Sequence, residues 1–109
     1  MTAARTAAEE YARTVNAGDL EGLVELFGDD AQVIQRSGTF TGKSEIREFY
    51  RDTILPHGPQ LVATRFVTSD DTCIMEAVST TNAGRRSEIA DLFDVDDAGR
   101  VTRLSIYFR

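Results

Sequence analysis

Cysteine, histidine, proline and basic side chains are all scarce in this sequence of 109 residues. The single cysteine, Cys73, excludes an intrachain disulfide and fits a reducing, cytoplasmic location. One histidine and one cysteine far apart in the chain give no metal-ligand spacing, so we expect no metal site. With 12 basic against 18 acidic residues the net charge is −6, which disfavours nucleic-acid binding because phosphate contacts need lysine or arginine.

Long apolar runs are also missing. None approaches the roughly 18 residues that cross a membrane, and the first residues lack the apolar stretch of a signal peptide, so no membrane partner is expected. No low-complexity tract is present and hydrophobic residues make up 41% of the chain, which argues against disorder. This length and composition predict one domain over residues 1–109 with a modest core.

Helical periodicity dominates the first half of the chain. The spacing of apolar residues predicts helices over residues 3–16, 19–28 and 46–54. Gly18 is the expected left-handed cap of the first helix, and the Asp19 side chain is the expected cap of the second.

Strands and tight turns dominate the second half. After a short strand over residues 31–35 and a loop over residues 37–42, alternating patterns predict four strands, over residues 61–68, 72–81, 85–95 and 100–108. Short turns between consecutive strands imply an antiparallel, meandering sheet. Helices first and strands after is typical of an α+β fold. A twisted sheet of four or five strands with three helices on one face would form a cone around an apolar cavity.

Asp91 is the residue that most strongly indicates a functional site. By strict alternation it shares a strand face with Ile89 and Phe93, which are core-forming residues. A carboxylate among buried apolar side chains is costly unless it is paired or protonated. A bulge would instead turn Asp91 outward, and a structural ion pair would also explain it. We predict an acid that faces the cavity.

Four segments of the chain resemble the NTF2-like superfamily, and within it the SnoaL-like proteins and the ketosteroid isomerases. They are residues 11–20 (YARTVNAGDL), 27–31 (FGDDA), 41–50 (TGKSEIREFY) and 91–101 (DLFDVDDAGRV). The resemblance covers nearly the whole chain and implies the superfamily's cone-shaped fold. It also implies a hydrophobic small-molecule substrate, no cofactor and, as often in this superfamily, a homodimer.

The resemblance assigns a role to three residues. In ketosteroid isomerases, a tyrosine of the first helix and an acid of a late strand donate hydrogen bonds to a carbonyl that becomes an enolate. The matching positions here are Tyr11 and Asp91. The aspartate base of the isomerases corresponds to Gln35, and an amide cannot accept a proton at neutral pH. The expected apolar wall of the pocket consists of Phe27, Phe49, Tyr50, Val78, Leu104 and Phe108.

Two further titratable residues have both a functional and a structural interpretation. Glu76 shares a strand face with Ile74 and Val78 and would be a replacement base if that face lined the cavity. If the face is the outer side of the sheet, Glu76 pairs with Arg65 instead, and this is the interpretation we favour. His57, in a loop at the expected rim, is either a proton shuttle or simply solvated.

These observations leave functions of different classes open. The first is a small cofactor-independent isomerase or cyclase that acts on a hydrophobic carbonyl or polyketide-like substrate, in which Tyr11 and Asp91 polarise an oxygen and Gln35 orients the substrate. The second is a non-catalytic binding or dimeric assembly module of the same fold. An epoxide-opening hydrolase or cyclase and a weak ketosteroid isomerase are the remaining alternatives.

Overall fold

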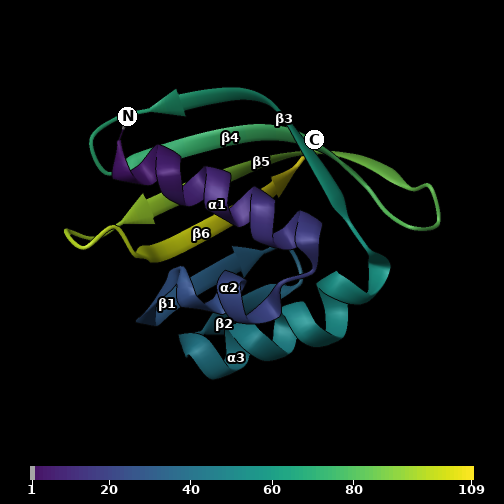
Figure 1. Ribbon diagram of the computed structural model, residues 1–109, viewed down its shortest axis with the longest axis horizontal. Coiled ribbons are helices and arrows are strands. Elements are labelled where there is room, and N and C mark those ends of the chain that lie inside the picture. Colours follow the sequence, from purple (N-terminus) through teal and green to yellow (C-terminus); the bar gives the residue numbers. More distant parts are fainter. Residues whose placement is uncertain (1) are drawn as a thin grey trace.

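One curved sheet of six strands, covered by helices on one face only, forms the framework of the protein (Figure 1). The computed structural model describes residues 2–109. The sheet order is β2-β1-β6-β5-β4-β3. Its strands are β1 (Phe27–Gln35), β2 (Gly38–Thr41), β3 (Gln60–Thr68), β4 (Thr72–Thr80), β5 (Arg86–Val95) and β6 (Val101–Phe108). The predicted α+β class and the meander of the last four strands are confirmed.

The residues that connect the first two helices each have a defined structural role. Helix α1 (Ala3–Ala17) ends at Gly18, whose φ of 67° is the left-handed conformation that glycine adopts without strain. The Asp19 side chain accepts a hydrogen bond of 3.0 Å from the Gly22 N–H and so caps α2 (Leu20–Glu25). The Asn16 amide bonds both backbone groups of Leu61, at 2.6 and 3.0 Å, which fixes the end of α1 against β3.

Four elements differ from the sequence-based expectations. Helix α2 ends at Glu25 rather than near Gly28, and β1 begins at Phe27 rather than at residue 31. Residues 38–41, predicted as loop, form β2 and pair antiparallel with β1, and β1 in turn pairs parallel with β6. The third helix begins as α3 (Gly42–Phe49), continues as a π-helical turn, η1 (Tyr50–Ile54), and ends as a 3-10 turn, η2 (Leu55–His57). Pro56 lies in this last turn, where proline is tolerated because it need not donate a backbone hydrogen bond.

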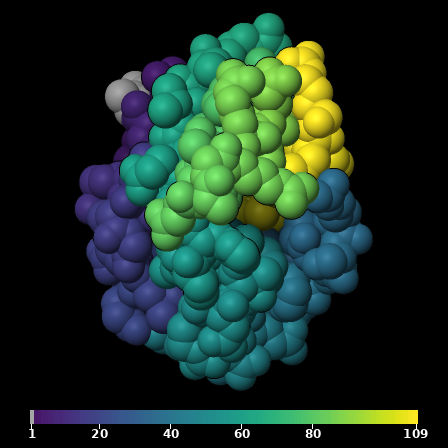
Figure 2. Space-filling view, turned by 90° about the vertical axis from the view of Figure 1, so that its right-hand side faces the viewer, coloured from purple at the N-terminus to yellow at the C-terminus, as the bar shows by residue number. Residues whose placement is uncertain are grey.

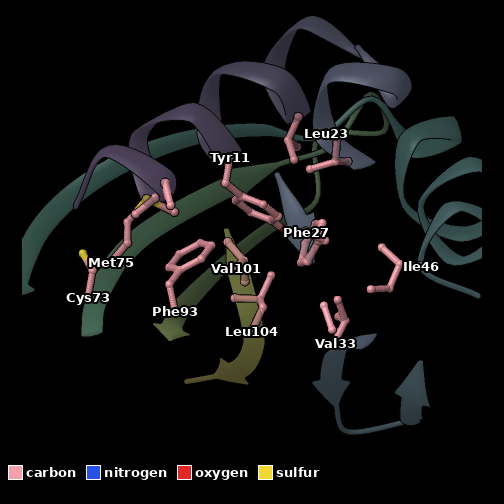
Figure 3. Close-up of a cluster of buried hydrophobic side chains, with 14 of the residues drawn as sticks. Tyr11, Leu23, Phe27, Val33, Ile46, Cys73, Met75, Phe93, Val101 and Leu104 are labelled. Carbon is pink, nitrogen blue, oxygen red and sulfur yellow. The ribbon is translucent and has the colours of Figure 1, made fainter. Parts of the chain in front are cut away.

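The hydrophobic core lies between α1 and the inner face of the sheet (Figure 3). Tyr11 projects from α1 toward Phe93 of β5, and their ring centroids are 5.2 Å apart in an edge-to-face arrangement. Alternation places Cys73, Met75 and Ala77 of β4 on this same inner face, and all are buried. Within residues 2–109, no helix is both long enough and apolar enough to cross a membrane.

Candidate functional site

A cavity of about 480 Å³ opens at one end of the sheet. Its mouth is a hollow beneath the β4–β5 hairpin, bordered by the segment that follows α3 and by the β1–β2 hairpin (Figure 2). The exposure of the lining residues falls from this mouth inward, since His57 and Arg85 are exposed whereas Tyr11 and Asp91 are buried. A cavity of this size accommodates a small organic molecule.

Asp91 lies at the buried end of the cavity. Its side chain is 1% exposed, and no protein group hydrogen-bonds either carboxylate oxygen. Burial raises the pKa of Asp91 from 3.8 to about 7, because the charged form has lost its hydration without gaining a partner. Asp91 is among the residues that line the cavity, so it faces inward as the alternation predicted, and no bulge or ion pair turns it away. At neutral pH this side chain can both give and receive a proton.

Tyr11 and Tyr50 form a hydroxyl pair near Asp91. Their oxygens are 2.8 Å apart, and the two rings meet edge to face with centroids separated by 6.0 Å. Burial raises the pKa of Tyr11 well above its usual value, with smaller contributions from Tyr50 and from the charge of Asp91. If Tyr50 donates to the Tyr11 oxygen, the Tyr11 proton is free to point into the cavity. In that arrangement the Tyr50 hydroxyl group would polarise the Tyr11 hydroxyl group as a donor to the cavity.

Gln35 and His57 also line the cavity, but neither is poised for proton transfer at its buried end. The Gln35 amide is engaged with the β1–β2 turn. With its oxygen oriented toward the turn it accepts from the backbone N–H groups of Ser37 and Gly38 at 3.2 and 3.1 Å. His57 is exposed, and its backbone carbonyl accepts a 2.8 Å hydrogen bond from the Asn82 N–H, which ties η2 to the β4–β5 hairpin.

The apolar wall expected from the sequence divides into three groups. Phe49 and Phe108 line the cavity. Phe27, Tyr50 and Leu104 are fully buried in the core behind it. The expectation that Val78 lines the cavity is wrong, and so is the alternative that placed Glu76 there as a base. Both residues alternate with the inward-facing residues of β4 and lie on the outer face of the sheet. There Glu76 pairs with Arg65 at 3.5 Å, as the structural interpretation predicted.

Several cavity residues were missed. Ser87 and Ile89 share a face of β5 with Asp91, and Ile106 faces Asp91 across the β5–β6 pair, so alternation and pairing were the available signals. The remaining missed residues lie in loops or in elements that only the tertiary structure brings to the cavity. They are Val15, Arg36, Ile54, Pro59, Leu61, Ser79, Thr81 and Ala83. Within residues 2–109, no three histidine, cysteine, aspartate or glutamate side chains converge to hold a metal ion.

Comparison with known proteins yields one family and a consistent set of folds. The model of the SnoaL-like domain family matches residues 8–104. The structure of RV0760c from Mycobacterium tuberculosis superposes with a TM-score of 0.89 at 22% identity, covering 100% of this chain and 92% of that one. The same mycobacterial protein has also been crystallised in complex with estradiol-17beta-hemisuccinate.

Two other solved structures have the same fold but are associated with different enzyme activities. A protein from Kribbella flavida, thought to be a ketosteroid isomerase, has a TM-score of 0.87 at 21% identity, with 98% of this chain and 78% of that one covered. The epoxide hydrolase/cyclase-like enzyme SalBIII, of pyran ring formation in the polyether salinomycin, has a TM-score of 0.85 at 16% identity, with 96% and 89% covered. At these identities the likeness establishes the fold alone.

Proposed function

The chain belongs to the SnoaL-like domain family of the NTF2-like superfamily, as its sequence resemblance indicated, and on that premise we propose that it is a cofactor-independent cyclase or isomerase of a hydrophobic, oxygen-bearing substrate. Asp91 in its protonated form and Tyr11 donate to one substrate oxygen. The observation that carries this proposal is a buried, unpartnered carboxyl group at the inner end of an otherwise largely apolar cavity. Such a group is costly to keep unless a ligand uses it.

The composition of the cavity favours acid-initiated ring formation over steroid isomerisation. Asp91 is the only carboxyl group among its lining residues, so no second carboxylate stands ready to abstract a carbon-bound proton while Asp91 donates. A substrate that carries its own nucleophile needs no such base. Its hydroxyl oxygen forms the new C–O bond while the epoxide C–O bond breaks or the carbonyl π bond opens. The oxygen released in this way takes the Asp91 proton, and the proton of the attacking hydroxyl group returns to the Asp91 carboxylate. This exchange balances without a cofactor.

The size of the cavity and the relatives support the substrate class. A volume of about 480 Å³ suits a molecule of a few fused or newly formed rings. Solved structures of the same fold include a protein in complex with a steroid ester and an enzyme of pyran ring formation. A hydrophobic carbonyl or polyketide-like substrate with an internal hydroxyl group fits both.

A substrate panel tests this function. We expect hydroxy-epoxides of polyketide size to cyclise faster with the protein than without it, and we expect Asp91→Asn to lower that rate by about 100-fold or more. Glu76→Gln, which changes a carboxyl group on the outer face, is the matched control and should keep full activity.

Three outcomes of the panel are informative. Rapid isomerisation of 5-androstene-3,17-dione would favour a ketosteroid isomerase. Tight ligand binding with no turnover of any panel member would favour a non-catalytic binding module. A cyclisation rate that Asp91→Asn leaves unchanged would contradict the role of this acid.

We also propose that the outer face of the sheet joins two copies of the chain. No helix covers this face, and it carries exposed apolar side chains, with Val62 65%, Val67 47% and Tyr107 60% exposed. Burying such a patch is the usual driving force for association. Light scattering should give about twice the chain mass of 12.0 kDa, and Tyr107→Lys should shift the protein toward the monomer. A monomeric wild type at micromolar concentration would refute this arrangement.

A further inference from the structure

The mouth of the cavity is positively charged although the chain is acidic. The net charge of the protein is −6, yet the lining residues include two arginines, Arg36 and Arg85, and only one acid, the buried Asp91. Because the pKa of Asp91 is raised to about 7, much of its charge is absent at neutral pH. The charged side chains at the mouth are thus opposite in sign to the net charge of the molecule.

The two arginines have no carboxylate partners within the described chain. Six other arginines form ion pairs with aspartate or glutamate at 4.0 Å or less. Within residues 2–109, no such pair involves Arg36 or Arg85. The two arginines lie far apart in the sequence: Arg36 directly follows β1, and Arg85 directly precedes β5. The fold therefore brings two unneutralised guanidinium groups to one opening.

Arg36 is held in an orientation that suits a planar anion. Its guanidinium carbon lies 4.3 Å from the centroid of the Phe108 ring, which itself lines the cavity. Stacking on an aromatic face restrains the guanidinium plane and leaves its N–H groups at the edge free to donate. Arginine presents such groups in a fork that matches the two oxygens of a carboxylate.

We propose that the substrate is amphipathic, with an apolar body along the cavity, an oxygen at Asp91 and a terminal carboxylate bound at the mouth by Arg36 and Arg85. The oxygen end of this arrangement rests on the proposed function; the carboxylate end does not. Asp91 lies six residues from Arg85 along β5, so their backbones are about 20 Å apart at the rise of an extended strand. Both side chains extend into the cavity, so the ligand oxygen and the ligand carboxylate that they bind are closer together than the two backbones. Their separation matches the length of a compact multi-ring molecule.

A matched pair of ligands isolates the charge. Estrone 17-(O-carboxymethyl)oxime and its methyl ester share the phenol and the rings, and they differ by one negative charge at the far end. By isothermal titration calorimetry at low salt we expect the acid to bind at least about tenfold more tightly than the ester, because two guanidinium groups receive its charge. Raising the salt to about 0.5 M should shrink this preference by screening.

Variants assign the preference to the mouth. The double variant Arg36→Gln with Arg85→Gln should bind acid and ester with equal affinity, because both cationic partners of the carboxylate are removed. Arg86→Gln is the matched control, since Arg86 adjoins Arg85 but does not line the cavity, and it should keep the preference. Equal binding of both ligands to the wild type, a preference that survives the double variant, or no binding of the acid at millimolar concentration would overturn the proposal.

The same titrations separate this proposal from the proposed function. Tyr11→Phe should weaken both ligands by the same factor and leave the ratio of their affinities unchanged. If Tyr11→Phe weakened neither ligand while the preference for the acid persisted, the oxygen-binding role would fail and the carboxylate site would stand.

Discussion

Replacing Asp91 by asparagine is expected to stabilise the protein by about 2.5 kcal/mol more at pH 8 than at pH 5. The pKa of Asp91 is about 7 in the folded protein and 3.8 in the unfolded reference. Between these values the folded state keeps a proton that the unfolded state has released. The contribution of Asp91 to the free energy of unfolding is therefore most favourable below about pH 4. It falls by about 1.4 kcal/mol per pH unit between pH 4 and 7 and levels off above 7. Asparagine never ionises, so the variant lacks this loss.

Urea denaturation gives the free energy of unfolding of the wild type and of Asp91→Asn at pH 5 and at pH 8. The difference between the two proteins is then compared between the two pH values. Any effect of the amide group that does not depend on pH cancels in this comparison. Glu76→Gln is the matched control because it removes a carboxyl group from the outer face, and no comparable gain at pH 8 is expected there. A change in the free energy of unfolding that is the same at both pH values for Asp91→Asn would mean that Asp91 ionises normally in the folded protein.

Tyr11→Phe is expected to weaken binding of the phenol equilenin by about 10- to 100-fold. The phenol oxygen mimics the substrate oxygen, and removing one hydrogen bond to a group with anionic character costs roughly 1.5–3 kcal/mol. Tyr50→Phe should act indirectly, because it removes only the 2.8 Å hydrogen bond that polarises Tyr11. We expect a loss of about threefold to tenfold there, the size of one neutral hydrogen bond.

Fluorescence titration of equilenin provides the readout, and thermal unfolding of each variant checks that the fold survives. Tyr107→Phe is the matched control, since it removes the same hydroxyl group from an exposed tyrosine on the outer face and should leave the affinity unchanged. If Tyr11→Phe bound equilenin as tightly as the wild type, the hydroxyl pair would have no part in recognising a ligand oxygen.

The buried end of the site was predictable because local patterns determine it. Asp91 follows the alternation of an uninterrupted strand, and Tyr11 follows the apolar stripe of a well-capped helix. Each pattern fixes the direction of its side chain without reference to distant parts of the chain. The motif around Gly18 is likewise local, since a left-handed glycine followed by a capping aspartate is sufficient to end one helix and begin another.

The faces of β4 were not predictable in the same way. Ile74 and Val78 are apolar, and so are Met75 and Ala77 with which they alternate, so hydrophobicity does not show which set faces the helices. Only the pairing with Asp91 on β5 decides it, because Met75 lies directly opposite that residue. For the same reason the sequence left both a base and an ion pair open for Glu76. The structure shows the ion pair with Arg65, which was the favoured interpretation.

Contacts between distant segments account for the rest. Tyr50 bonds Tyr11 across 39 residues of sequence, and β2 pairs only with β1, which joins β6 in parallel. The gathering of Arg36 and Arg85 at one opening depends on this same long-range pairing. The depth of a side chain is also a property of the assembled fold, which is why Phe27 and Leu104 proved to be core residues rather than cavity lining.

Asp91 is an unpaired acid at the buried end of the cavity, and we expect it to keep its proton up to about pH 7. Carboxyl ¹³C NMR of the wild type, with the Asp91 signal assigned by its loss in Asp91→Asn, tests this claim most directly. We expect a titration midpoint of about 7 for Asp91 and a clear change of that signal when equilenin binds. A midpoint near the usual value of about 4, or a signal indifferent to the ligand, would contradict it.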